Sequence, residues 1–522
     1  MPFSAMVIEI PLAQDGVTGS RNPVTALPSQ VLEANSIRFE GGFLAKEGAQ
    51  APYTPASLGA SVLNGTDWWP TSTEQRQVVL LGNGTVRKDS GAGTFPVTLA
   101  TGLTVTQPSQ FVDAGAEKTG QPRKLVLFTG TNPPQVLAGD GATMTALATP
   151  AADWTGTTQP LCGAVHANRL WAAGNLSDPH RVYFSTVEDH EKFDDPTTSG
   201  SLPVFPGEGD RITGLLSYRG LLIVGKAPRG IYVIDTTGVV VTSYAVTVLS
   251  HAIGLASANA IAQVDNDVLF LDSAANMQSM AAVQALGDLS TQTYGQAVDM
   301  ANFLTQRVNA AASPWARMVY YGLKRELHLA LAGTGSPTNT ARLVVDFNGL
   351  TRERFRYSSP EACPALWLMR TPQSGALHPM RGDTSGVVWH MDQPGVSPAG
   401  VPGEASRILT PAFDLGHADP GLAGRMKQGH YLELVTTLDG PWNVDVDIYW
   451  DGRKHQSLAF GLRNAYGLPA GQIVNLQQRL LGSGRRIQFD IRQTVGSQSF
   501  SVYRLYMGFS ALDSRQSEVF WR

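Results

Sequence analysis

Three pairs of carboxylates lie close together in the sequence and are its first candidates for acid–base chemistry. They are Asp194 with Asp195, Asp265 with Asp267, and Asp445 with Asp447. A glycosidase needs two carboxyl groups held at a set separation on either side of the scissile bond. Asp445 and Asp447 alternate along one predicted strand beside the Asp451–Gly452 turn, which favours a solvated sheet edge. Asp194 and Asp195 precede a proline, which favours a loop.

The remaining motifs do not assemble a reaction centre. Asp265-Asn266-Asp267 resembles the start of a calcium loop, but the glycine and the distal glutamate are missing, so a turn is favoured. The ten histidines include no H-E-x-x-H, and no G-x-S-x-G is present. Cys162 and Cys363 lie 201 residues apart, which indicates two buried thiols. The sequence therefore predicts no catalytic, cofactor-binding or metal-ligating residues, no cofactor and no enzyme activity.

Aromatic residues offer the main route to a binding site. Tryptophans that could line a sugar pocket are Trp68, Trp69, Trp154, Trp171, Trp315, Trp367 and Trp389. Several fall within apolar segments, which favours packing in a core. The run from Arg352 to Tyr357 alternates basic and aromatic residues as a nucleic-acid-binding strand does, but a charged edge strand is favoured. Arg381-Gly382-Asp383 spells an integrin-binding tripeptide within an expected hairpin turn.

The elements that would position these residues repeat along the chain. Apolar runs separated by small-residue turns begin near Trp68, Phe111, Gly163, Ile212, Ala258, Trp315 and Leu366, at intervals of 43 to 57 residues. A strand-rich repeat of this length is typical of a β-propeller blade. The sequence therefore predicts a mainly β fold with a six- or seven-bladed propeller over residues 61–395. Apolar spacing of three and four predicts one helix inserted at about 282–308.

The two ends of the chain lie outside this repeat. Residues 1–60 are expected to form an extended N-terminal arm with a hairpin that turns at Gly41–Gly42. A tract rich in proline and glycine from Gln393 to Gly403 marks a domain boundary. Beyond it, residues 404–522 contain alternating strands near 431–435, 444–450, 486–492 and 500–506, which predict a β-sandwich-like domain.

Composition narrows the function classes. Among 522 residues only 16% are charged, against about 25% in a typical protein, so we expect much of the surface to meet other protein. The net charge of −4, with acids and bases interleaved, argues against a nucleic-acid clamp. The N-terminus lacks the basic region of a signal peptide, and no apolar run reaches the ~18 residues of a membrane span. We expect the chain to fold in the cytoplasm where it is made.

Three segments resemble a known family. They are Asn35–Gly42 with Lys46–Gly48, His166–Gly174 with Val182–Ser185 and Phe193, and Ile212–Leu216 through Gly230–Ile234 to Ile253–Gly254 and Val268–Leu271. These segments resemble the tail nozzle proteins of short-tailed bacteriophages, also called tail tubular protein B. The resemblance spans roughly residues 30 to 280, and the C-terminal strands fit it more loosely. It rests on fold-type signatures and carries over no catalytic residues.

The resemblance implies a structural virion protein of the viral tail, assembled in the host cytoplasm. Such subunits are β-propellers with added β-domains, and six of them form a ring below the portal and the head-to-tail adaptor. Its expected partners are the other copies in the homohexamer, the adaptor, tail fibre or spike proteins, and duplex DNA that passes through the lumen without specific binding during genome ejection. Six copies at −4 each carry −24. We expect a mainly acidic or polar lumen, because Lys or Arg contacts to phosphates would hold the DNA.

Two other functions stay open from the sequence. One is a carbohydrate- or receptor-binding propeller on a tail fibre or cell surface, and the other is a propeller glycosidase. The sequence lacks a polar-aromatic set repeated in every blade, which weakens the first, and lacks paired acids at equivalent repeat positions, which weakens the second. A ring-forming subunit needs neither feature, so the structural function is favoured.

Overall fold

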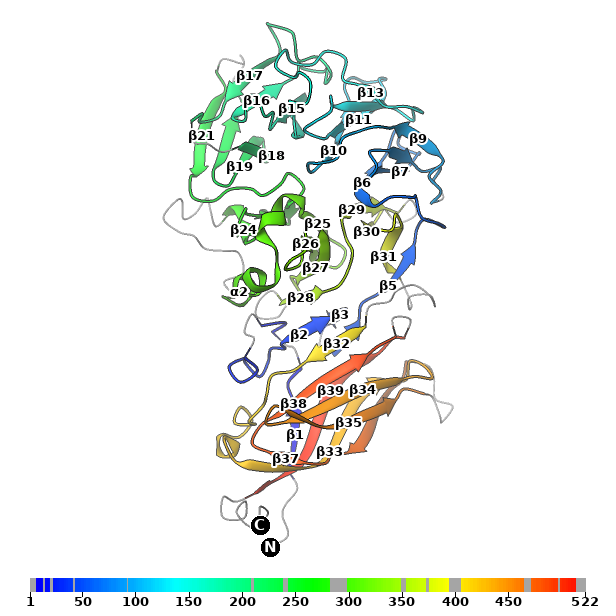
Figure 1. Cartoon of the computed structure of the whole chain (residues 1–522), viewed down its shortest axis with the longest axis vertical. Coiled ribbons are helices and arrows are strands. Elements are labelled where there is room, and N and C mark those ends of the chain that lie inside the picture. Colours follow the sequence, from blue (N-terminus) through cyan, green and yellow to red (C-terminus); the bar gives the residue numbers. More distant parts are fainter. Residues whose placement is uncertain are drawn as a thin grey trace.

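The chain folds into a β-propeller joined to a C-terminal β-sandwich. The computed structural model describes residues 6–12, 15–18, 22–40, 43–91, 93–207, 211–237, 243–281, 298–348, 354–371, 375–393, 405–463, 471–495 and 498–512. Figure 1 shows the propeller sheets arranged around a ring, with the sandwich beyond the edge that carries β28 (Arg354–Ser358). The mainly β fold class expected from the sequence is confirmed.

Within these residues, seven antiparallel sheets form the blades of the propeller. The first four are β6 (Val62–Trp68) to β9 (Val97–Ala100), β10 (Gln110–Ala116) to β13 (Thr145–Ala146), β14 (Cys162–His166) to β17 (Gly200–Pro203), and β18 (Arg211–Tyr218) to β21 (Ala245–Ser250). The others are β22 (Ile261–Val264) to β24 (Met277–Ser279), β25 (Arg317–Tyr321) to β28, and β29 (Ala365–Arg370) to β31 (Val388–Gln393) with β5 (Ala49–Pro52). The sequence left six and seven blades open, and seven such sheets are present.

The second strand of each blade is mostly buried because neighbouring blades cover both of its faces. Those strands are β7 (Arg76–Leu81), β11 (Arg123–Phe128), β15 (Arg169–Ala173), β19 (Leu221–Ala227), β23 (Asp267–Leu271), β26 (Glu326–Ala332) and β30 (Leu377–Gly382). The third strands of the first four blades and of the sixth are β8 (Val86–Lys88), β12 (Gln135–Ala138), β16 (Arg181–Phe184), β20 (Ile231–Asp235) and β27 (Asn339–Asp346). Between β7 and β8, Gly84 takes a φ of 75°, a conformation that favours glycine.

The N-terminal residues close the ring. Strand β5 pairs with β31, with Trp389 opposite Pro52 and His390 opposite Ala51, so the seventh blade takes its outermost strand from the start of the chain. On the other side of that blade, the Trp367 ring lies over Gly65 of the first blade. Its indole nitrogen donates to Gln77 Oε1 at 2.9 Å. The first and last blades are thus held together by strand pairing and by side-chain packing.

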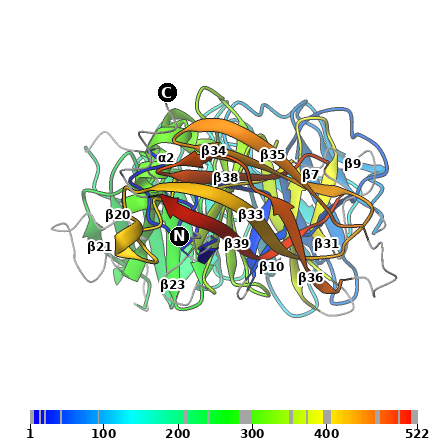
Figure 2. The same ribbon diagram turned by 90° about the horizontal axis from the view of Figure 1, so that it is seen from below.

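The sandwich also depends on the N-terminal residues. One sheet has the order β3 (Ile37–Glu40), β4 (Phe43–Lys46), β39 (Ser501–Leu512), β33 (Met426–Thr437) and β36 (Ile473–Arg479), with β1 (Met6–Ile10) paired to β39 and β37 (Ser483–Gly484) paired to β33. The other has the order β2 (Glu33–Asn35), β32 (Ser406–Leu409), β38 (Ile487–Gln493), β34 (Asn443–Trp450) and β35 (Arg453–Gly461). Figure 2, seen from the sandwich end, shows the two layers.

The expected arm is therefore built into both parts of the molecule. The hairpin expected near Gly41–Gly42 is present, because β3 and β4 pair from Ile37 opposite Lys46 to Glu40 opposite Phe43. Of the helix expected at 282–308, the structure describes α2 (Val298–Arg307), and residues 282–297 lie outside the described part. Two short 3₁₀ helices, η3 (Ala310–Trp315) and η4 (Pro420–Leu422), precede blade six and β33.

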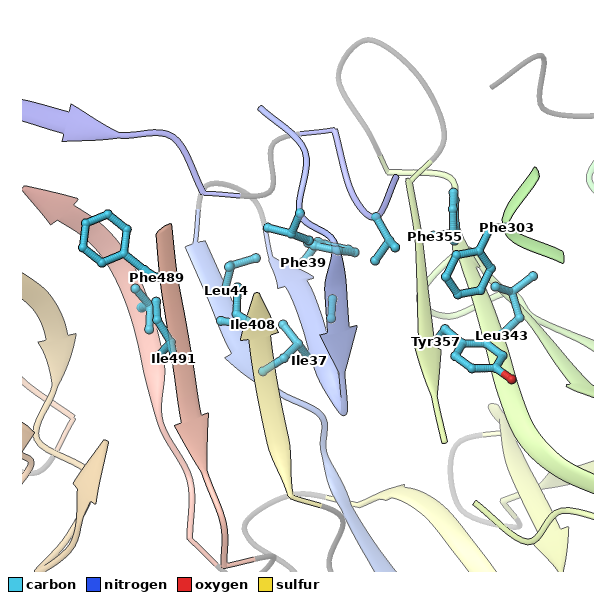
Figure 3. Close-up of a cluster of buried hydrophobic side chains, with 14 of the residues drawn as sticks. Ile37, Phe39, Leu44, Phe303, Leu343, Phe355, Tyr357, Ile408, Phe489 and Ile491 are labelled. Atoms are coloured by element: carbon cyan, nitrogen blue, oxygen red, sulfur yellow. The ribbon is translucent and has the colours of Figure 1, made fainter. Parts of the chain in front are cut away.

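One apolar core runs from the sandwich into the propeller. Figure 3 shows Phe489 and Ile491 of β38 beside Ile408 and Leu44, then Ile37 and Phe39, and beyond them Phe355, Tyr357, Leu343 and Phe303 of the propeller side. The N-terminal strands β3 and β4 lie in the middle of this series. Because buried apolar area stabilises a fold in proportion to its size, the shared core opposes separation of the two parts.

We predict that Gly65→Val opens the contact between the first and seventh blades. A Cβ at Gly65 would lie 2.6 Å from the Trp367 ring, so overpacking should lower the free energy of unfolding by about 1–3 kcal/mol. Chemical denaturation measures the change. The matched control is Gly322→Ala, whose new Cβ would come no closer than 3.8 Å to Tyr320 and should leave stability almost unchanged. Equal stability of Gly65→Val and the native chain would contradict the packing described.

Candidate functional site

Buried charges join the N-terminal strands to the sixth and seventh blades, and we call this set the ionic junction. Its arginines are Arg38, Arg342, Arg356 and Arg381, and its carboxylates are Glu47, Glu326, Glu361 and Asp392. All eight residues are at least nine-tenths buried at the side chain. Arg38 lies on β3, Glu47 follows β4, and the others come from the blades. The junction exists only where these separate parts of the chain meet.

Arg38 connects the hairpin to both blades. Its Nε donates to Glu326 Oε1 at 3.1 Å, and its Nη1 donates to Asp392 Oδ1 at 2.6 Å. Asp392 also accepts from Tyr321 Oη at 2.9 Å and from Lys324 Nζ at 3.0 Å. A single guanidinium from β3 thus holds the end of β31 against the start of β26.

Glu47 makes the second connection. Arg356 donates from Nε to Glu47 Oε1 at 2.8 Å and from Nη2 to Glu326 Oε2 at 3.1 Å, so it lies between the two carboxylates. Arg342 pairs with Glu47 as well, and its Nε donates to Glu361 Oε2 at 2.9 Å. Paired guanidinium and carboxylate groups of this kind form strong, directional hydrogen bonds. Every carboxylate named here has an arginine partner.

The electrostatics of the junction follow from burial and pairing together. Burial alone would raise the pKa of Glu47, but Arg342 and Arg356 outweigh it and hold the pKa well below its usual value. Glu326 behaves in the same way: burial opposes ionisation, while Arg356, His328 and Arg38 lower its pKa. Burial lowers the pKa of His328, which keeps that imidazole neutral beside Glu326. Because an unpaired buried charge is costly, the junction stabilises the fold only when it is complete.

The propeller centre is closed by polar contacts. The Ser109 carbonyl accepts from Asn64 Nδ2 at 2.8 Å, from Asn259 Nδ2 at 2.9 Å and from Arg317 Nη1 at 3.3 Å. These donors come from the first, fifth and sixth blades, so the contacts cross the axis of the ring. Side chains therefore fill the centre at this level.

Carboxylates of the three pairs singled out in the sequence bind neighbouring backbone N–H groups, hydroxyls or cations. Asp195 lies in a loop, where it accepts from the backbone of Thr197 and Thr198 and pairs with Lys192 at 3.2 Å. These contacts lower its pKa to about 2. Asp265 lies in the turn between β22 and β23, as expected, and pairs with Arg325 at 3.0 Å. Asp267 accepts from Ser279 Oγ at 2.5 Å.

The solvated edge expected for Asp445 and Asp447 is wrong for Asp447. Strand β34 lies inside its sheet between β35 and β38, and Asp447 is buried there. Lys454 of β35 pairs with it at 2.7 Å, and Arg492 of β38 pairs with it from the other side. The pattern of alternation correctly placed both acids on one face, but it did not reveal the two cations that cover that face.

The edge strand expected around Arg352–Tyr357 is confirmed by β28, but the expectation that its charges guard an open edge is wrong. Residues 351–353 lie outside the described part, and β28 is the outermost strand of its blade but is covered by the N-terminal residues. Arg356 is fully buried in the ionic junction, and Phe355 belongs to the shared core. Arg356 and Phe355 therefore neither guard an open edge nor present nucleic-acid bases with an aromatic platform.

The remaining sequence candidates are structural. Five of the seven candidate tryptophans are buried in the core, as the packing interpretation predicts: Trp68, Trp154, Trp171, Trp367 and Trp389. Trp69 and Trp315 are partly exposed. Cys162 and Cys363 are buried free thiols, as expected. Asp383 of the Arg-Gly-Asp tripeptide accepts from the Trp389 indole at 2.7 Å and from the turn that follows β30.

Sequence reasoning missed the ionic junction. The signal was the placement of charged residues inside apolar strands, as with Glu326 and His328 in β26 and with Arg356 in β28. In the described residues, no three His, Cys, Asp or Glu side chains gather closely enough to hold a metal ion. Among the helices that the structure describes, none has the length and apolar character needed to cross a membrane.

We predict that Glu326→Gln destabilises the protein strongly. The change removes the charge that faces Arg38 and Arg356, so the free energy of unfolding should fall by roughly 3 kcal/mol. The matched control is Glu188→Gln at the Lys118–Glu188 pair, whose side chains are 61% and 48% exposed and whose contribution should be under about 1 kcal/mol. Denaturant titration of both variants makes the comparison. If both variants lowered the free energy of unfolding by the same small amount, the buried junction would contribute no more to stability than an exposed ion pair does.

We further predict that stability is lost at acid pH through the junction carboxylates. The pKa of Glu47, Glu326 and Asp392 is lowered on folding, so their contribution is present above the unfolded pKa near 4.5 or 3.8 and is lost as the pH falls through the folded pKa. The midpoint of thermal unfolding, followed from pH 7 to pH 3, should fall most steeply below about pH 4.5. Glu326→Gln should flatten that fall, and an unchanged slope in this variant would contradict the assignment.

No protein-family model matches the chain, and no curated protein matches its sequence. One similar solved structure is BBS1N in complex with ARL6DN, with a TM-score of 0.42 and 10% identity over 67% of this chain and 97% of that one. Another is YCF48 bound to D1 peptide, with a TM-score of 0.39 and 9% identity over 70% of this chain and 100% of that one. A third is the computationally designed Ika8 protein, with a TM-score of 0.35 and 12% identity over 74% of this chain and 99% of that one. These weak likenesses carry no argument about function.

Proposed function

We propose that the chain is a structural subunit of the tail nozzle of a short-tailed bacteriophage, where it forms a stiff element in the wall of a ring. The observation that carries this proposal is that two sets of contacts join the propeller to the sandwich and its N-terminal strands. They are the shared apolar core and the ionic junction. Domains joined by a small polar interface move relative to one another, whereas a large apolar interface holds them fixed. A subunit tied in this way keeps its shape while the genome leaves through the ring.

In such a ring, the DNA passes beside the subunits and not through a propeller. Contacts to Ser109 close the propeller centre, so the channel is formed between copies. The arginines of the ionic junction are buried against carboxylates and add nothing to an exposed basic surface. Six copies carry −24 in total. A mainly acidic or polar lumen lets duplex DNA slide, because phosphates find few Lys or Arg partners.

The position of the tryptophans favours this function over carbohydrate binding. A sugar platform needs an aromatic face open to the ligand, whereas Trp68, Trp154, Trp171, Trp367 and Trp389 are buried in the core. A tail fibre or cell-surface receptor-binding propeller is the alternative. A propeller glycosidase is weaker still, because Asp195, Asp265 and Asp447 are each engaged by a lysine or an arginine. The test therefore compares assembly with glycan binding.

We predict that the purified chain assembles into hexamers, alone or when mixed with portal and adaptor proteins. Native mass spectrometry at low concentration should detect a species of about 335 kDa, six times the 55.8 kDa of one chain. Glu188→Gln, which changes an exposed charge, should assemble as the native chain does. A protein that stays monomeric under both conditions and binds a glycan would contradict the proposal and favour the receptor-binding alternative.

A further inference from the structure

A cavity of about 410 Å³ opens at the propeller centre, next to the contacts around Ser109. Residues that precede or begin the first strands of five successive blades line it, in the segments 107–110, 161, 211–213, 256–259 and 310–314. These segments meet only in the closed ring. The volume lies within the range of small-molecule sites, roughly 300–1,000 Å³.

The lining combines apolar walls with a single cation. Alanine and proline side chains form much of the wall, among them Ala258, Ala311, Pro228 and Pro314, and Arg211 supplies the charge. Among the described residues that line the cavity, none is an aspartate or glutamate. A cation on an apolar wall without a carboxylate beside it attracts an anion that carries an apolar body.

Arg211 uses only part of its hydrogen-bonding capacity within the described residues. Its Nε and Nη2 donate to the Gly174 carbonyl at 3.0 and 2.6 Å, and its Nη1 donates to Gln107 Oε1 at 3.0 Å. A guanidinium has five N–H donors, so two are left without a partner in the described part of the chain. Burial lowers the pKa of Arg211, and the guanidinium remains charged at neutral pH.

Two more groups point to a missing anionic or polar partner. Ser273 lines the cavity, and its Oγ is buried without a hydrogen-bond partner among the described residues. Behind Asn259, the buried Arg317 donates to the carbonyls of Ser109 and Leu63, and its Nε is also unpartnered there. Buried polar atoms in native proteins are almost always satisfied. A second guanidinium close to the cavity raises the potential for an anion.

We propose that this cavity binds a carboxylate carried on a small apolar body, with Arg211 as its cationic partner. A planar guanidinium pairs with a carboxylate through two parallel hydrogen bonds, and the alanine and proline walls contact the rest of the ligand. The carboxylate belongs either to a free short-chain organic acid or to a glutamate on an extended peptide. The proposal does not depend on ring assembly.

The sequence contains two acids that could compete for Arg211. Glu208 and Asp210 precede Arg211 in the chain and lie outside the described residues. If either acid is the counterion of Arg211, the cavity does not require an outside ligand. The experiment must therefore separate an internal carboxylate from an external one.

Isothermal titration calorimetry of the full chain with sodium isovalerate tests the free acid, and the same titration with an Ala-Ala-Glu-Pro-Ala peptide, blocked at both ends, tests the peptide. The controls are isovaleramide and the peptide with glutamine in place of glutamate, neither of which should bind. Arg211→Gln should weaken the carboxylate at least about tenfold. Arg219→Gln, at the exposed turn after β18 of the same blade, should bind as the native chain does. Ala258→Leu, which narrows the cavity and keeps Arg211, should also weaken binding.

Binding of either carboxylate with these variant effects supports the proposal, and the arm that binds identifies the source. If neither carboxylate gives a heat of binding at concentrations up to about 10 mM, the proposal is overturned, because a weaker affinity would leave the site unoccupied. Equal binding by Arg211→Gln, with a folded protein confirmed by thermal unfolding, also overturns it. The variants Asp210→Asn and Glu208→Gln test the internal acids. If either variant binds the added carboxylate at least about tenfold more tightly than the native chain does, the chain's own acid is the partner of Arg211. That result overturns the need for an external ligand.

Discussion

The structure depends on the N-terminal strands β2 to β5, which pair with strands of both the sandwich and the propeller. Strands β2, β3 and β4 complete the sandwich, and β5 completes the seventh blade. Arg38 and Glu47, from the same stretch, supply one cation and one anion that the buried charges of the sixth blade require. Neither part of the molecule is complete without this segment, so the propeller and the sandwich are coupled through one short piece of chain.

Apolar and ionic interactions have different roles in this coupling. The shared core, from Phe489 through Ile37 to Phe355, provides most of the favourable free energy because it removes apolar area from water. The ionic junction contributes less net energy, since burying each charge is costly, but it accepts only one arrangement of partners. A shifted register of β3 would remove Arg38 from Glu326 and from Asp392. The junction therefore fixes orientation, which is the property that a wall element of a ring needs.

Sequence patterns predicted the parts of the fold that are local. Apolar second strands with small-residue turns, such as β7 with Asn83-Gly84 after it, predicted the repeating sheets, and alternation predicted β34 and β38. Pairing over long distances could not be predicted: β2 lies opposite β32, and Arg38 meets Glu326 at a separation of 288 residues. For the same reason the sequence pattern predicts surface positions for Arg356 and Asp447, whereas the charged groups that cover them come from other parts of the chain.

The proposal that the chain forms part of a tail nozzle ring is tested most directly by locating it in phage particles. Electron micrographs of phage particles that carry a gold-labelled version of the chain would locate it without any assumption about its chemistry. The account predicts label in a ring directly below the head-to-tail adaptor, around the channel axis. Label confined to the ends of fibres, or its absence from particles that are otherwise complete, would contradict the account.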